Sequence, residues 1–179
     1  MTTPVDVVGF WRMAGPEKWF AKNRAFDQAI ALRFEAAHHA AARGEHDSWI
    51  ATPEGALALL ILLDQFPRNL FRDSSHAFAT DGKARAVAKT AIGEGFDAQL
   101  EPALAPFFYM PLMHSEDLGD QEQCVVLCEA LGAKQTLDYA KLHRDIIARF
   151  GRFPHRNPVL GRQTTAEEQA FLDEGGFAG

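Results

Sequence analysis

Eight consecutive apolar residues, Ala56–Leu63, constrain the fold of this chain more than any other feature. The preceding Thr52–Glu54 supplies an N-cap, a first-turn proline and an acid, so the run belongs to a helix, which we expect to end at Phe66-Pro67. A helix that is apolar on every side has to be covered by other elements. A membrane span needs about 20 apolar residues, so we expect a buried central helix instead.

The rest of the chain consists of helical patterns separated by stop signals. We expect helices over residues 23–43, 81–92, 115–131 and 135–150, and a last helix opened by the capping box Thr165–Glu168. Prolines interrupt the aromatic segment 102–111. No stretch alternates as a strand does, and no helical repeat period holds. The pattern predicts a single all-α domain over residues 1–179, with roughly seven to nine helices.

Composition excludes several classes of protein. The net charge of −6 argues against a general nucleic-acid or anionic-lipid binder. The start, MTTPVDVVGF, lacks the basic region of a secretory signal. Cys124 and Cys128 lie one helical turn apart. This spacing favours two free thiols in the core over a disulfide or a zinc site. We therefore expect a cytoplasmic protein without a membrane anchor, and we find no motif for a cofactor.

The segment 143–162 is a basic island in this acidic chain. It contains five arginines and one aspartate, a local charge of +4. The arginines are Arg144, Arg149, Arg152, Arg156 and Arg162. Gly151, Pro154 and Pro158 predict a stiff, non-helical loop, in which Phe153 and Asn157 are extended because each precedes a proline. Guanidinium forks suit carboxylates and phosphates, so the loop either pairs with acids of the protein itself or holds an anionic ligand.

Two further polar clusters accompany the loop. Asp64 ends the most apolar helix, where the helix dipole disfavours an acid, so we expect a cation from Arg68, Arg72 or the loop. The second cluster is His114–Asp117, in which Ser115 is a good N-cap.

Histidines in these clusters suggest two kinds of chemistry. A metal site at His114 would need a tight ligand spacing that the sequence lacks, so we predict none. Either His114 or His155 could carry a proton, as imidazoles do near neutral pH.

Several stretches together resemble one family. They are Phe10-Trp11 with Trp19-Phe20, Leu62–Asn69, Phe78–Asp81, Tyr109–Asp117, and Phe150–Asn157 with Leu160–Arg162. On these motifs the chain is similar to the bacterial domain-of-unknown-function family 924, from about Val5 to Gly176. The resemblance implies an all-α fold of stacked antiparallel helix pairs, similar to a tetratricopeptide-repeat superhelix. It brings no activity, ligand or catalytic residue with it.

Two functions remain open at the level of sequence. The first is binding, and possibly turnover, of a small anionic molecule where the three clusters meet, with His114 or His155 as the proton carrier. The residues that we expect to bind this ligand are Asp64, Gln65, Arg68, Asn69, Glu116, Asp117, Arg152, Arg156, Asn157 and Arg162. The second is a scaffold that binds a protein or peptide through the aromatic region Phe10–Phe20 or an exposed groove. Binding of nucleic acid is disfavoured by the net charge.

Overall fold

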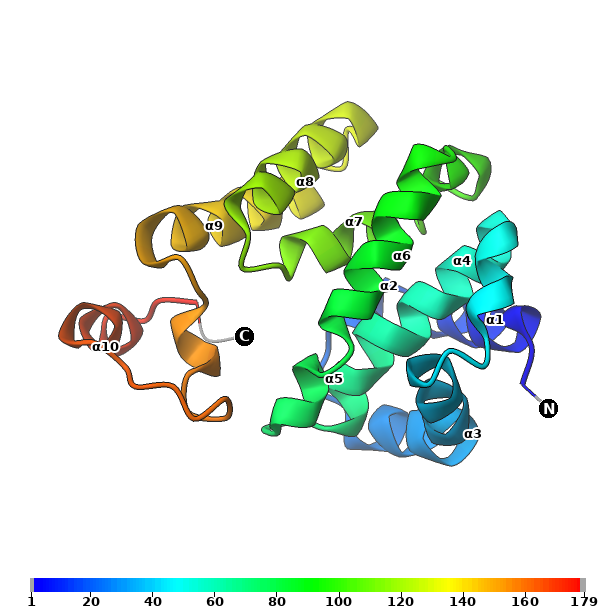
Figure 1. Cartoon of the computed structure of the whole chain (residues 1–179), viewed down its shortest axis with the longest axis horizontal. Helices are drawn as coiled ribbons and strands as arrows, with labels where there is room; N and C mark the ends of the chain where they lie inside the picture. Colours follow the sequence, from blue (N-terminus) through cyan, green and yellow to red (C-terminus); the bar gives the residue numbers. More distant parts are fainter. Residues whose placement is uncertain (1, 178–179) are drawn as a thin grey trace. The chain divides into compact units, whose positions relative to one another are not determined.

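The computed structural model describes residues 2–177, and every regular element among them is helical (Figure 1). The predicted all-α class is confirmed, whereas the stacking of helix pairs as in tetratricopeptide repeats stays a prediction. The described chain separates into two compact units, one formed by residues 2–72 with His76–Pro111, the other by Asp73–Ser75 with residues 112–177. No helix in the described range is long and apolar enough to cross a membrane.

The first unit is built around the apolar helix that the sequence singles out. Its helices are α1 (Pro4–Ala14), α2 (Pro16–Trp19), α3 (Arg24–Ala42), α4 (Pro53–Leu60), α5 (Phe66–Leu70) and α6 (Asp81–Gly93). Helix α4 packs against α1 and α6, and the run Ala56–Leu63 is at most 1% exposed. The predicted central helix is therefore confirmed, together with its N-cap Thr52, whose hydroxyl accepts from the amide of Gly55.

The predicted end of this helix at Phe66-Pro67 is wrong. A π-helical turn, Ile61–Gln65, follows α4 and leads directly into α5. The amide of Phe66 donates to the carbonyl of Ile61, five residues back. Pro67 then lies in the first turn of α5 and has no amide hydrogen to donate. The preceding carbonyls of Leu62 and Leu63 accept instead from Nδ1 of His38 and the hydroxyl of Thr80.

The second unit begins within α7 (Pro106–Met113). It contains α8 (Leu118–Leu131), α9 (Lys134–Phe150), a 3₁₀ turn at Pro154–Arg156 and α10 (Ala166–Asp173). Helices α8 and α9 form an antiparallel pair (Figure 1). Its core joins Ile146, Ile147 and Phe153 to partly buried phenylalanines, and the free thiols of Cys124 and Cys128 are fully buried, as the sequence predicts.

Three local predictions in this region are wrong. The aromatic segment before Met113 is helical, with Pro111 inside α7. The N-cap of α8 is Asp117, whose carboxylate accepts from the amide of Asp120, whereas the hydroxyl of Ser115 donates to the carboxylate of Asp120. Asn157 is not extended but αR, because its amide donates to the carbonyl of Pro154 and closes the 3₁₀ turn.

Candidate functional site

The loop between α9 and α10 is fixed at its start by Arg152. Gly151 ends α9 in the left-handed conformation, at φ +67°, which turns the chain out of the helix. The guanidinium of Arg152 then forms a fork on Glu168, with Nε–Oε1 at 2.6 Å and Nη2–Oε2 at 2.8 Å, and also donates to the carbonyl of Gln163. The loop is thereby tied to the first turn of α10.

Glu168 is the centre of this contact. Its side chain, 3% exposed, also accepts from the amide of Thr165 and from Nδ2 of Asn157. The hydrogen bonds and charge of Arg152, and then the hydrogen bonds of Thr165, outweigh burial, which raises the pKa of Glu168, and they lower this pKa to about 2. The carboxylate therefore stays charged at neutral pH and holds the arginine, the loop and the N-cap of α10 together.

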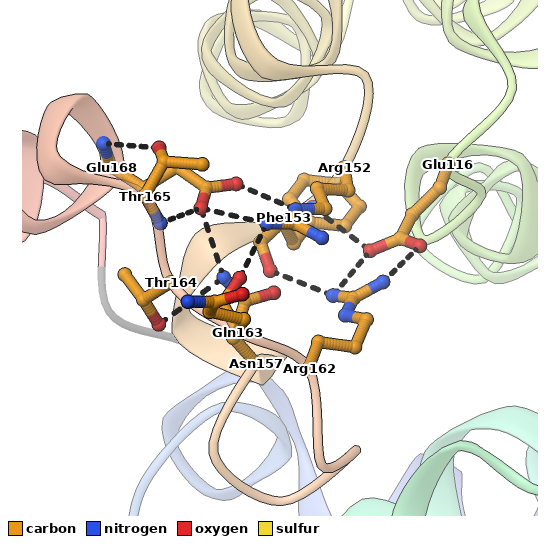
Figure 2. A network of polar contacts seen from close by, with 9 residues as sticks. All are labelled: Glu116, Arg152, Phe153, Asn157, Arg162, Gln163, Thr164, Thr165 and Glu168. Atoms are coloured by element: carbon orange, nitrogen blue, oxygen red, sulfur yellow. Dashed lines mark hydrogen bonds and ion pairs between the residues drawn. The ribbon is translucent and has the colours of Figure 1, made fainter.

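Arg162 fixes the other end of the loop. Its Nη1 and Nη2 form a fork on Glu116, at 2.7 and 3.0 Å, and Nη2 also donates to the carbonyl of Phe153. Glu116 accepts in addition from the amide of Phe153. Burial raises the pKa of Glu116, but these hydrogen bonds outweigh it and the net pKa is lowered. Figure 2 shows this continuous network from Glu116 through the loop to α10.

Two atoms of the network lack a hydrogen-bond partner within residues 2–177, although they are buried. They are Nε of Arg162 and Oδ1 of Asn157. A buried unsatisfied group costs about 1–3 kcal/mol, more when it is charged, so such groups commonly meet a water or a ligand atom. Both atoms belong to residues that the sequence predicts for ligand binding.

A hollow of about 640 Å³ lies beside this network. It is lined by Arg152, Arg162, Gln163, Thr164, Thr165 and Ala166. The hollow therefore opens at the start of α10, where Thr165 is the N-cap and forms the predicted capping box with Glu168. The amides of Ala166 and Glu167 have no intrahelical acceptor at this position. Guanidinium groups, hydroxyls and a helix N-terminus together favour a negatively charged ligand.

The histidines form a separate group within the second unit. His143 is 7% exposed, and its ring lies 6.4 Å from that of His114 and 5.4 Å from that of Phe153, measured between centroids. The ring of His155 lies 5.6 Å from that of Phe153, between centroids. The guanidinium of Arg156 lies over the face of the Phe153 ring, 4.4 Å from its centroid. His143 and His155 therefore flank Phe153, and His114 lies beside His143. Neither His114 nor His155 is among the residues that line the hollow.

The predicted residues of the Asp64 cluster lie in the first unit and bind one another. Arg68 supplies the cation that Asp64 requires, with 3.2 Å between Nη1 and Oδ1, and forms a fork on Asp81 at 3.0 Å. Gln65 donates to Asp64 at 2.6 Å. Burial lowers the pKa of Arg68, but the two carboxylates outweigh it and raise the pKa above its usual value. Asp64 is 1% exposed, so this cluster is a charged network inside the unit.

Asn69 and Arg72 extend this network to α3. Both donate to the carboxylate of Asp27, at 2.8 Å from Asn69 and 2.7 Å from Nε of Arg72. Arg72, one of the cations expected for Asp64, therefore pairs with Asp27.

The structure thus brings together part of the predicted site. Arg152 and Arg162 line the hollow, Glu116 and Asn157 hold the loop beside it, and Asp117 caps α8. Sequence reasoning missed Gln163, Thr164 and Ala166, and it read the Thr165–Glu168 capping box only as a helix start. The nearness of that capping box to an arginine-rich loop was the signal that could have located the hollow. Among the described residues, no three His, Cys, Asp or Glu side chains are grouped to hold a metal ion.

Comparisons with known proteins give a family but no activity. A family model described as "Bacterial protein of unknown function (DUF924)" matches residues 7–176. No curated protein matches the chain. A solved structure, that of the protein of unknown function ATU0120 from Agrobacterium tumefaciens, is similar with a TM-score of 0.93 and 50% identity. The match covers 96% of this chain and 97% of that one.

Proposed function

Because this chain belongs to the DUF924 family of bacterial proteins of unknown function, we propose its function from its own geometry: it binds a small anion in the hollow at the start of α10. The observation that carries the proposal is the lining, which joins the guanidinium groups of Arg152 and Arg162 to the open end of a helix. The chemical class is a phosphate or a carboxylate, since both accept two parallel hydrogen bonds from a guanidinium.

The ion pairs of the loop agree with a binding role, because they hold the arginines in place before any ligand arrives. Arg152 uses Nε and Nη2 for Glu168 and Gln163, which leaves Nη1 outside these hydrogen bonds. Arg162 keeps Nε without a partner in the described chain. A ligand in the hollow therefore meets guanidinium groups whose side-chain entropy has already been lost on folding, which favours affinity.

The proposal concerns binding. The assignment of His114 and His155 as proton carriers stays a prediction, and so does the participation of Asp64, Gln65, Arg68 and Asn69. Any turnover would need one of these imidazoles to reach the bound anion.

Substitution of Ala166 tests the proposal without removing an ion pair. Ala166 lines the hollow and is the first residue of α10, where an acidic side chain stabilises the helix. Ala166→Glu therefore keeps the fold and places a negative charge in the site. We expect about tenfold weaker binding of inorganic phosphate or succinate in isothermal titration calorimetry, since one charge repulsion at the edge of a site is worth about 1–2 kcal/mol.

The matched control is Ala166→Gln, which has the same shape and no charge. We expect its affinity to stay within about threefold of the wild type. Weakening of binding in wild type by added salt is a second signature of an anion site. Equal affinity in the Glu and Gln variants, or no heat with either anion, contradicts the proposal.

A further inference from the structure

The first unit has an apolar groove between α1 and α3, which takes no part in the proposed anion binding. It has a volume of about 330 Å³ and is lined by Phe10, Met13, Ala14, Lys18, Asn23, Ala25, Phe26 and Ala29. We call it the α1–α3 groove. Its floor is the stacked pair Phe10–Phe26, with ring centroids 5.5 Å apart. A concave surface with an aromatic floor accepts apolar side chains of a partner.

The helices beside the groove expose apolar side chains in a regular order. On α1, Val5, Gly9 and Met13 follow one another at four-residue spacing, and Met13 is 88% exposed. A Cβ built on Gly9 would meet nothing within 4 Å, so the backbone of α1 is open there. On α3, Leu32 continues the face of Ala25 and Ala29 and is 89% exposed. Exposed apolar side chains beside an apolar groove are typical of a protein–protein contact.

The surroundings of the groove are basic, although the chain is acidic. Residues 10–33 contain five lysines or arginines and two acids, a local charge of +3 in a chain of −6. Lys18, Lys22 and Arg24 are exposed beside the apolar side chains. A partner that fits this surface presents apolar side chains and carboxylates on one helix face.

Helix α8 of the same chain has such a face. Its exposed side chains Leu118, Glu122, Val126 and Glu129 recur every three or four residues and so share one side of the helix. Leu118 is 41% and Val126 64% exposed. Helix α8 contains three acids and no lysine or arginine. We call these four residues the α8 outer face.

We propose that a second copy of this chain occupies the α1–α3 groove with its α8 outer face. The apolar pair on α8 spans eight residues, the same separation as Val5 and Met13 on α1, so the two ridges match in length. Glu122 and Glu129 then face the lysines that flank the groove. The contact joins two different surfaces. Two copies that exchange both surfaces about a two-fold axis form an isologous dimer, whereas a contact that does not close in this way is heterologous and gives a ring or a filament. Its strength depends on charge, and added salt weakens it.

Charge reversal on each side of the contact tests the proposal in the full chain. One variant is Lys18→Glu with Lys22→Glu, and the other is Glu122→Lys with Glu129→Lys. Sedimentation velocity at low salt is expected to show association of the wild type and at least about tenfold weaker association of each variant alone. An equimolar mixture of the two variants is expected to associate again, because the reversed charges attract.

The matched control is Lys89→Glu with Lys141→Glu, exposed residues of α6 and α9 that belong to neither surface, which changes the net charge by the same amount. It is expected to associate as the wild type does. A further variant, Gly9→Gln, fills the open backbone of α1; we expect weaker association together with a higher melting temperature, because glycine disfavours a helix interior. Loss of association through unfolding would lower that temperature instead.

Several results would overturn the proposal. They are a wild type that stays monomeric up to its solubility limit, a control that dissociates as fully as the two reversals, and a mixture that does not re-associate. Sedimentation of the monomeric protein with vesicles of phosphatidylserine and phosphatidylcholine, without self-association, would assign the same surface to a membrane instead.

Discussion

His143 shows how burial and neighbouring charges set the chemistry of a single side chain. It lies on α9, and its Nδ1 donates to the carbonyl of Tyr139 in the preceding turn. Desolvation first, and then the nearby charges of His114, Arg156 and His155, lower the pKa of His143 to about 4. The imidazole is therefore neutral inside the protein at neutral pH, which disfavours a role as a cationic ligand group.

This pKa predicts an acid-dependent loss of stability. The unfolded chain binds a proton at His143 near pH 6.5, whereas the folded chain binds it only near pH 4. Between these values the unfolded state holds more protons, so the free energy of unfolding falls as pH falls. We expect His143→Phe to reduce this fall by about 1–3 kcal/mol in urea titrations. An unchanged pH dependence in the variant would show that His143 is solvated in the folded protein.

The residue scale also shows where sequence reasoning succeeds. A buried carboxylate at the end of an apolar helix requires a cation, and Arg68 provides it. The sequence left three candidate partners because it did not reveal the π turn that precedes α5. The prediction of an extended Asn157 was wrong because a local rule was outweighed by a hydrogen bond. A residue before a proline prefers an extended conformation, but the hydrogen bond that closes the 3₁₀ turn holds Asn157 in the αR region.

At the scale of elements, the segment between α9 and α10 is a loop held by two carboxylates of the protein. Stop signals and capping motifs placed α3, α6, α9 and α10 to within a few residues, because these signals are local. The partners of Arg152 and Arg162 could not be predicted, since Glu168 and Glu116 become neighbours of the loop only after the second unit has packed. For the same reason, the sequence revealed the basic segment 143–162 but not the hollow beside it, which forms only when the loop packs against α10.

Glu116→Gln tests whether this packing orders the loop. The amide of Phe153 keeps an acceptor, but Arg162 loses its charged partner, which is worth about 1–2 kcal/mol for a partly exposed pair. We expect faster amide hydrogen exchange across residues 151–162, while the core of α8 keeps its protection. Asp138→Asn, an exposed substitution on α9, is the control. Loop protection equal to the wild type would show that Glu116 does not order the segment.

At the scale of the whole molecule, the all-α class followed from helix periodicity, and the buried α4 followed from its apolar run. The division into two compact units could not be predicted from the sequence, because no linker or change in composition marks the boundary between them. The proposed anion site lies within the second unit and the proposed docking groove within the first. The docking proposal also uses the α8 outer face of the second unit, but it shares no residue with the lining of the hollow, so each proposal can fail without the other.

The most direct test of the anion site is a titration of the isotope-labelled protein with inorganic phosphate, followed by NMR of backbone amides and arginine side chains. We predict saturable shifts of the amides of Ala166 and Glu167 and of the guanidinium signals of Arg152 and Arg162. In Ala166→Glu we expect the shifts of Glu167, Arg152 and Arg162 only at about tenfold higher phosphate. Signals at the start of α10 that stay unchanged to saturating phosphate, or that move equally in Ala166→Glu, would contradict the account.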